Sequence, residues 1–271
     1  MRIFRKILTA AVFAALMISV CSCSLFNRSE PEPAPETVRV TFPEGTTVIG
    51  AALKLEENGV CTKDEFLAAV NNTQRENKFA QSIENPQERP YLLEGYIYPD
   101  TYDFYVGEGA EMALSRFLEN TEAKLTDEMY ARAAELSMTM DEIITLASII
   151  QAEASVPSVM ADVSSVLHNR LNSKEYPRLQ CDATVFYLKR SVEPYIDQAQ
   201  AYKYDEFYDT YDREGLPAGP ITNPGLEAIT AALYPSKTDY YFFVTDSDNN
   251  YYFAKTFEEH KENCKTAGVT Q

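Results

Sequence analysis

Thr139–Pro157, with the sequence TMDEIITLASIIQAEASVP, predicts the helix that matters most in this chain. Thr139 and Glu142 stand in the order of a capping box, in which each side chain bonds the backbone N–H of the other residue. Pro157 ends the helix, because proline lacks the N–H that would continue it. Four apolar side chains follow at helical spacing and predict a face buried in a core: Ile143, Leu146, Ala147 and Ile150.

The next position on that apolar face is Glu153, three residues after Ile150 and four after Ile149. A carboxylate on a buried face is costly unless it is paired or neutral. Burial also raises the pKa of a carboxyl group, which is the property that a general acid needs at neutral pH. Glu153 is therefore a candidate catalytic acid. The alternative is an ordinary glutamate at a helix end, exposed where the chain turns towards Pro157.

Segments on both sides of this helix predict further helices mixed with short strands. Periodicity and capping signals predict helices over Glu111–Leu125, Thr126–Leu136, Val159–Leu171 and Thr256–Cys264. Alternating aromatic runs predict strands over Tyr91–Tyr105, Tyr240–Thr245 and Tyr251–Ala254, the last two joined as a hairpin. Asn223 and Pro224 predict the start of one more helix, which Pro235 stops. This mixture favours an α+β domain over residues 91–271, which contains the candidate acid Glu153.

Residues 37–90 predict a small module in front of that domain. Val38–Phe42 alternates as a strand, and Val48–Glu57 has helical spacing. Thr62–Glu65 repeats the capping-box order and opens a second helix. A strand and two helices in this order, followed by a polar link, resemble a LysM-like module. The alternative is an N-terminal subdomain that only packs on the main one.

The N-terminus predicts export and attachment to a membrane. Basic residues precede an apolar run from Ile7 to Val20, which is shorter than the roughly 20 residues of a membrane-spanning helix and typical of a signal peptide over residues 1–22. Cys23 follows in a lipobox-like context, so we expect it to be the lipid-modified first residue of the mature chain. An uncleaved membrane anchor is the alternative. Residues 23–36 predict an extended tether, rich in proline and glutamate.

The composition argues against several classes of protein. With 24 Lys and Arg against 41 Asp and Glu, the formal net charge is −17, and nucleic-acid phosphates need a positive surface instead. Beyond the N-terminus the cysteines are only Cys61, Cys181 and Cys264, scattered and odd in number, so no disulfide framework is expected. The two histidines, His168 and His260, are far apart, and we expect neither a zinc site nor a cofactor. The chain has no Trp, so a sugar-binding groove would have to stack sugar rings on Tyr or Phe.

Three further segments carry more polar and turn-forming residues than packing requires. Leu216–Ile221 is rich in proline and glycine and predicts a rigid loop that shapes a groove. Asn169-Arg170 lies near a helix end. Arg178–Thr184 places three polar residues at strand spacing, hence on one face: Gln180, Asp182 and Thr184. Ordinary turn or cap chemistry is the alternative for each segment.

These segments, in this order, resemble the YceG/MltG family of endolytic murein transglycosylases. The resemblance covers about Val38 to His260 and rests on these stretches: 93–102 LEGYIYPDTY, 146–154 LASIIQAEA, 169–171 NRL, 179–185 LQCDATV, 208–211 YDTY, 215–225 GLPAGPITNPG and 235–238 PSKT. It implies cleavage of the β-1,4 bond between N-acetylmuramic acid and N-acetylglucosamine of nascent strands without water. One Glu protonates the leaving oxygen and then takes the proton of the sugar's own 6-hydroxyl, which closes a 1,6-anhydro ring.

By motif position the resemblance implies Glu153 as the catalytic residue. It also implies five substrate-binding groove residues: Glu94, Gln180, Asp182, Tyr211 and Asn223. The chain departs from the family pattern at three places. Gln151 stands where many relatives have an acid, and Cys181 and Ala183 replace a common Ser and Pro. The family usually carries an uncleaved membrane helix, whereas this N-terminus predicts a lipoprotein.

The resemblance further implies peptidoglycan glycan strands as substrate and cell-wall synthases, the penicillin-binding proteins, as partners. It implies a membrane-anchored position on the extracytoplasmic face. Two rival functions stand beside this one. A non-catalytic peptidoglycan-binding lipoprotein is disfavoured by the intact motif around Glu153, and an exported solute-binding protein would need two similar α/β lobes, of which the sequence shows no sign.

Overall fold

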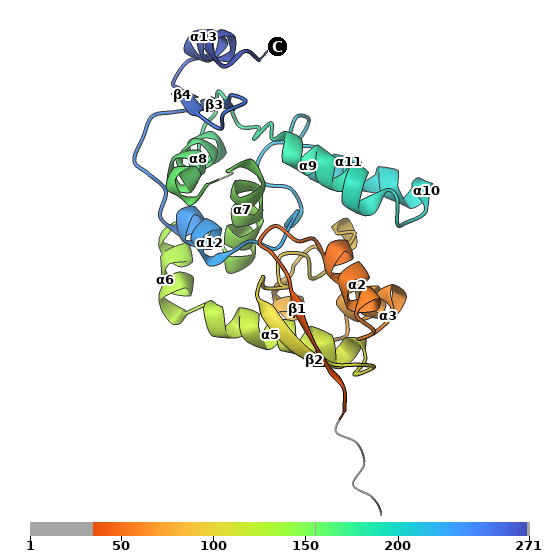
Figure 1. Ribbon diagram of the computed structural model, residues 1–271. Helices are drawn as coiled ribbons and strands as arrows, with labels where there is room; N and C mark the ends of the chain where they lie inside the picture. Colours follow the sequence, from red (N-terminus) through yellow and green to blue (C-terminus); the bar gives the residue numbers. More distant parts are fainter. Residues whose placement is uncertain (1–34, 155, 270–271) are drawn as a thin grey trace, which may run out of the picture. The chain divides into compact units, whose positions relative to one another are not determined.

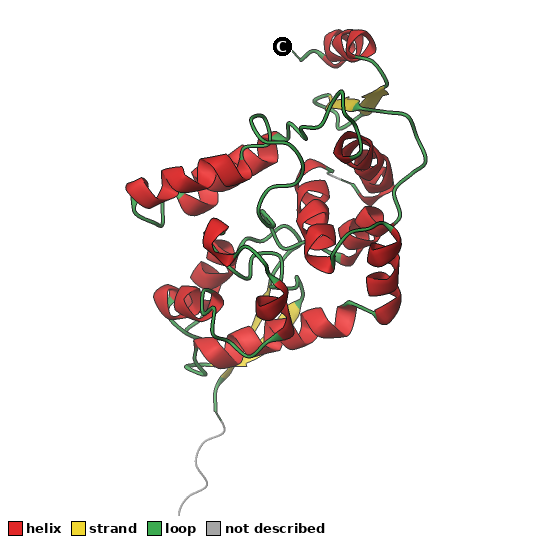
Figure 2. Cartoon of the chain, turned by 180° about the vertical axis from the view of Figure 1, so that it is seen from behind, coloured by secondary structure: helices red, strands yellow, loops and turns green. Residues whose placement is uncertain are grey.

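Helices form most of the computed structural model, which describes residues 35–154 and 156–269 (Figures 1 and 2). The N-terminal elements are β1 (Thr37–Thr41), α2 (Val48–Glu57), α3 (Lys63–Val70), α4 (Lys78–Ser82), β2 (Thr101–Tyr105), α5 (Ala110–Lys124) and α6 (Asp127–Glu135). The later elements are α7 (Met140–Glu153), α8 (Pro157–Leu171), α9 (Asp182–Tyr187), α10 (Gln198–Ala201), α11 (Asp205–Tyr208), α12 (Leu226–Leu233), β3 (Phe242–Thr245), β4 (Tyr251–Ala254) and α13 (Phe257–Ala267). Two antiparallel strand pairs among these helices confirm the predicted α+β class.

The predicted signal peptide and Cys23 lie outside the described residues, as does nearly all of the tether. Residues 37–271 form one compact unit. Across residues 35–154 and 156–269, every helix is too short or too polar to cross a membrane.

The N-terminal module is a strand, two helices and a second strand. β1 pairs antiparallel with β2 from Thr37 opposite Tyr105 to Thr41 opposite Thr101, and α2 and α3 lie between the two strands in the chain. Phe117 of α5 packs edge-on against Phe42 with ring centroids 5.0 Å apart, which joins α5 to the module. The predicted strand and both helices are confirmed. The predicted boundary at residue 90 falls between two strands of one sheet, and the LysM-like assignment stays a prediction.

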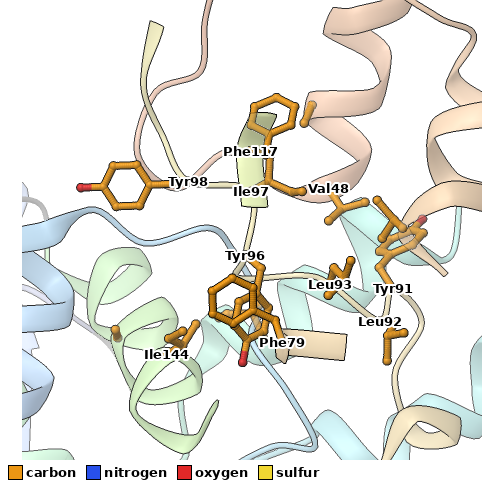
Figure 3. Close-up of a cluster of buried hydrophobic side chains, with 14 of the residues drawn as sticks. Val48, Phe79, Tyr91, Leu92, Leu93, Tyr96, Ile97, Tyr98, Phe117 and Ile144 are labelled. Carbon is orange, nitrogen blue, oxygen red and sulfur yellow. The ribbon is translucent and has the colours of Figure 1, made fainter. Parts of the chain in front are cut away.

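The segment from residue 91 to residue 100 was predicted as an alternating strand, and this is wrong. Only Thr101–Tyr105 is a strand, and residues 91–98 run through turns with every side chain buried (Figure 3). Alternation of side chains between two faces cannot identify a strand where both sides of the chain face the interior. Gly95 makes the turn, with φ +90°, and a Cβ there would lie 2.5 Å from Pro220 and 2.8 Å from Ile144. The chain therefore needs glycine at this position.

The helix predicted from Thr139 is α7, and its capping box is present. Its apolar surface is wider than the predicted stripe, because every side chain from Ile143 to Ile150 is buried. α12 and α8 pack against α7 in Figure 1, and α6 also contacts it. A helix whose charged side chains lie only at its ends, Asp141 and Glu142 at the start and Glu153 at the end, is a buried core helix. Its last residue, Glu153, is where the chain leaves the core.

Asn223 does not cap α12, contrary to the sequence prediction. The N-cap is Gly225, whose N–H donates to Oε1 of Gln151 at 3.0 Å. The Asn223 side chain is fully buried and bonds the loop in front of α2, as described below. Asn223 therefore makes a tertiary contact, although the local sequence pattern assigns its side chain to the start of α12.

The aromatic hairpin near the C-terminus is confirmed. β3 pairs with β4 from Phe242 opposite Ala254 to Thr245 opposite Tyr251. α13 packs on both strands, and Phe242 stacks on His260 with ring centroids 5.2 Å apart. The hairpin thereby lies beside the end of α8, which it contacts through β3.

Candidate active site

Glu153 lies half-buried at the C-terminal end of α7, in the wall of a pocket of about 490 Å³. The pocket is bounded by the end of α8, the loop before α9, the hairpin and α13. The residues that line it with Glu153 include Arg170, Gln180, Cys181, Asp182, Tyr211, Phe243 and His260. The hydroxyl of Tyr251 donates to the backbone oxygen of Glu153 at 2.9 Å, so β4 holds the end of α7 in place.

Burial raises the pKa of the Glu153 carboxyl from its ordinary value of 4.5 to about 7. The N–H of Ala183, 3.5 Å from Oε1, works in the opposite direction, and the negative charge of Asp182 raises the pKa further. A carboxyl group with a pKa near 7 populates its acid and base forms equally at neutral pH. Glu153 is therefore able both to give a proton and to take one back.

Three of the predicted groove residues are gathered around Glu153. Asp182 is the first residue of α9, and its Oδ1 accepts a hydrogen bond from the Tyr211 hydroxyl at 2.7 Å. Gln180 lies two residues earlier, and all three side chains are exposed at the pocket. They come from a loop and a helix start, so the predicted strand face with Thr184 is wrong. Thr184 points inward and donates to the Cys181 oxygen at 2.8 Å.

Arg170 also lines the pocket, although the sequence marks it only as a residue near a helix end. Its guanidinium is buried in the last turn of α8 and donates to the Leu179 oxygen at 3.0 Å and to Oε1 of Gln180 at 2.8 Å. Cys181 is also buried there, and burial raises the pKa of its thiol well above the usual value. Its sulfur is therefore a neutral packing group. The Asn-Arg-Leu stretch is the one sequence signal for Arg170.

Glu94 and Asn223 lie elsewhere, in the interior between the N-terminal module and the helical part. Glu94 is fully buried and accepts hydrogen bonds from the Val48 N–H at 2.9 Å and from Nδ2 of Asn223 at 2.9 Å. Oδ1 of Asn223 accepts from the Ile97 N–H at 2.7 Å. Burial raises the pKa of Glu94 to about 8. Neither residue lines the Glu153 pocket, so their predicted contact with substrate stays a prediction that the packing does not favour.

A larger pocket, of about 580 Å³, lies at the opposite end of α7. Four acidic side chains line it, those of Glu84, Asp141, Glu142 and Glu214. Asp141 is held by Arg89, whose Nη1 donates to Oδ1 at 3.0 Å, and by the Tyr96 hydroxyl at 2.7 Å, and Glu142 closes the capping box with Thr139. The raised pKa of the Glu153 carboxyl group favours the smaller pocket as the candidate site. Within residues 35–154 and 156–269, no three His, Cys, Asp or Glu side chains are grouped as metal ligands.

Known proteins resemble the chain along most of its length. An endolytic murein transglycosylase of Bacillus subtilis (strain 168) is 27% identical over 231 residues, which are 83% of this chain and 63% of that protein. One of Streptococcus pneumoniae serotype 2 is 27% identical over 86% of this chain and 45% of its own length. The chain thus spans about half to three fifths of these curated relatives.

A crystal structure of a yceG-like protein from Listeria monocytogenes superimposes with a TM-score of 0.70 at 28% identity. The match covers 83% of this chain and 75% of that one. The model of the YceG-like family matches residues 24–266, which include the α7 motif, the α9 loop and the hairpin. This chain belongs to the YceG-like family.

Proposed function

We propose that this chain is an endolytic peptidoglycan lytic transglycosylase in which Glu153 is the single general acid and base. The observation that carries the proposal is the placement of Glu153 in a pocket wall, where burial raises its pKa to about 7. The names of the curated relatives, endolytic murein transglycosylases, supply the reaction class.

The proposed reaction has two proton transfers through one carboxyl group. Protonated Glu153 gives its proton to the glycosidic oxygen between N-acetylmuramic acid and N-acetylglucosamine, and the C1–O bond breaks. The Glu153 carboxylate then takes the proton of the muramic acid 6-hydroxyl as this oxygen bonds C1, which yields a 1,6-anhydro end and returns the acid. The nucleophile is part of the substrate, so proximity replaces a second carboxylate that would activate water.

The exposed side chains around Glu153 are the proposed substrate contacts. Gln180 and Asp182 stand on one side of the pocket and Tyr211, 42% exposed, stands beside them. Phe243 of the hairpin lines the same pocket and offers an apolar ring for a sugar face. Glu94 and Asn223 are proposed to act at a distance, by fixing the loop that joins the N-terminal module to the rest.

Product analysis tests the chemistry. Purified peptidoglycan incubated with the chain should release fragments with 1,6-anhydro ends, identified by mass spectrometry. Reducing ends instead would mean hydrolysis, with Asp182 as the second carboxylate of an ordinary glycosidase. Binding of glycan strands without any cleavage would support the alternative function, a non-catalytic peptidoglycan-binding lipoprotein.

The location and the partners are also proposals. A lipid-modified Cys23 would hold the chain on the extracytoplasmic face of the membrane, beside the synthases that polymerise new strands. Intact-mass analysis of the membrane form should show an acylated chain that begins at Cys23. A chain that retains residues 1–22 would favour the uncleaved anchor. Crosslinking in cells should recover a wall synthase, and recovery of unrelated envelope proteins alone would argue against that partner.

A further inference from the structure

Arg170 is buried without a carboxylate partner. Its side chain is 7% exposed, and none of the ion pairs within the described residues includes it. Its two bonds go to neutral acceptors, and the ring of Phe242 lies 5.1 Å from its Cζ. Burying a guanidinium without an acid costs free energy. We therefore expect a role for the hydrogen bonds that Arg170 makes.

Those bonds hold a residue in an unusual backbone conformation. Gln180 has φ +56°, in the left-handed region that residues with a Cβ rarely adopt. Nη2 of Arg170 donates to the Gln180 side chain at 2.8 Å, and Nη1 donates to the carbonyl oxygen just before it, Leu179 O, at 3.0 Å. On the far side the Gln180 N–H donates to Thr210 O at 3.0 Å. Gln180 is thus held between α8 and the 209–212 turn.

The left-handed conformation of Gln180 sets the position of the first turn of α9. Two residues after Gln180, the first turn of α9 carries Asp182 and the N–H of Ala183. That N–H is the one that faces Oε1 of Glu153 at 3.5 Å. A change of backbone at Gln180 would move this turn away from the carboxyl group and admit water to it. Strained backbone that is held by its surroundings is common at functional sites.

We propose that Arg170 is a positioning residue that clamps Gln180 in its left-handed conformation and so keeps the first turn of α9 closed over the Glu153 carboxyl group. The proposal rests on the proposed function, in which Glu153 is the catalytic acid. Arg170 lines the pocket but is only 7% exposed, and the proposal gives it no part in binding the sugar or in transferring the proton. It acts through the loop, and it differs in this from Gln180 and Asp182, whose side chains are exposed at the pocket.

The clamp predicts a change in the titration of Glu153. Burial is the largest cause of the raised pKa of this carboxyl group, so opening the α9 turn to water lowers the pKa from about 7 towards 4.5. The leaving oxygen needs the protonated form. Activity is therefore present below the pKa and lost above it, and the alkaline limb of the kcat profile moves to lower pH when the clamp is released.

The experiment compares Arg170→Met and Arg170→Lys with Arg132→Met in the full chain. Arg132 is the control, because it also donates to a backbone oxygen at 3.0 Å, that of Leu233, and covers an aromatic ring at 5.1 Å, that of Tyr234. It differs from Arg170 in its ion pair with Glu135 at 2.8 Å, and it does not line the Glu153 pocket. We expect at least a tenfold loss of kcat in Arg170→Met and a lowered Glu153 pKa in a ¹³C NMR titration. Arg170→Lys should fall between, since one ammonium cannot serve both acceptors in the same geometry. Arg132→Met should match the wild type in both readouts.

Gln180→Gly supplies a second, independent arm. Glycine adopts positive φ without strain, so adding Gln180→Gly to Arg170→Met should return the Glu153 pKa towards about 7. The readout is the Glu153 pKa and not kcat, because the Gln180 side chain is itself a proposed substrate contact. A folded Arg170→Met protein with an unchanged Glu153 pKa would overturn the clamp while leaving the proposed function intact. Should Arg170→Met fail to fold, an unchanged Glu153 pKa in both Arg170→Lys and Gln180→Leu would overturn it equally. Full activity of Glu153→Gln, by contrast, would overturn the proposed function itself.

Discussion

Two glutamates, the fully buried Glu94 and the half-buried Glu153, show that burial alone does not assign a role to a side chain. Both have a raised carboxyl pKa, and in both cases burial is the main cause. Glu94 is enclosed and accepts hydrogen bonds from Val48 and Asn223, whereas Glu153 lines an open pocket. A proton on Glu153 can reach a ligand, and a proton on Glu94 cannot leave the interior. Access therefore separates a candidate acid from a structural carboxyl group.

Glu153→Gln should abolish turnover and leave the fold intact. The amide keeps the size of the side chain but cannot donate a proton to the leaving oxygen, and general acid–base catalysis contributes about 10²–10⁴-fold. One residue serves both transfers, so we expect a loss at the upper end, measured as the rate of release of anhydro-ended fragments. Glu135→Gln is the control, an exposed glutamate that ends α6 as Glu153 ends α7. Near wild-type release by Glu153→Gln would make Asp182, which lines the same pocket, the next candidate.

The free energy of unfolding should fall as pH rises from about 4.5 to about 8, through Glu94. Its pKa is about 8 in the folded chain against an ordinary 4.5, so in that window the unfolded chain releases a proton that the folded chain keeps. The contribution is fully present below pH 4.5 and lost above pH 8. Urea unfolding at several pH values should therefore give a flatter profile for Glu94→Gln than for wild type. A Glu94→Gln profile parallel to that of Glu135→Gln would show that Glu94 titrates normally.

At the scale of elements, a loop runs from residue 91 to residue 100, where the sequence predicted a strand. It passes between the N-terminal module and α7, and its side chains form part of the core (Figure 3). The Tyr96 hydroxyl donates to Asp141 at the start of α7, and the backbone carbonyl oxygen of Tyr96 accepts from the Thr121 hydroxyl of α5 at 2.7 Å. The loop thus fixes α7 relative to α5, and through α7 it fixes the position of Glu153.

Gly95→Ala should destabilise the chain by about 3 kcal/mol, because it adds backbone strain to overpacking. The new Cβ would meet Pro220 at 2.5 Å, and φ is +90°. Gly107→Ala separates the two effects: its φ is +74°, but no atom lies within 4 Å of the added Cβ, so about 1 kcal/mol is expected. Urea unfolding measures both. Equal losses of unfolding free energy in the two variants would mean that Pro220 moves away from the added Cβ at no cost in free energy.

At the scale of the whole molecule, the N-terminal module and the helical part share structure on both sides of residue 90. β1 pairs with β2, Val48 donates to Glu94, and Asn223 donates to the Thr46 oxygen at 2.7 Å. Each of these contacts joins a residue before 90 to a residue after it. The Glu153 pocket itself is formed entirely from residues after 150.

A fragment of residues 91–271 should fail to fold on its own, although it contains every residue of the pocket. It loses the partner of β2 and leaves the fully buried Glu94 without the Val48 N–H, and an unsatisfied buried polar group costs about 1–3 kcal/mol. Residues 35–271 should fold. Circular dichroism and amide exchange of the two fragments measure the difference. A folded 91–271 fragment would support the domain boundary that the sequence analysis placed at residue 90.

The sequence by itself determined the longer helices, the capping boxes and the candidate acid, but it predicted neither the short helices α4, α9, α10 and α11 nor the N-cap of α12. Capping boxes, prolines and apolar spacing are local signals, so α2, α3, α7 and α13 begin within a residue or two of their predicted starts. Glu153 interrupts an apolar face, and this local conflict is visible without the fold.

Only the tertiary structure shows how the side chains are arranged around that acid. Residues 91–98 are buried on both sides, so no alternation could reveal their path, and Asn223 leaves the helix start because the interior offers it Glu94 and the Ile97 N–H. Gln180 and Asp182 reach Glu153 through a left-handed turn rather than a strand face. Such contacts join residues 30 to 130 positions apart, and local periodicity carries no information over that separation.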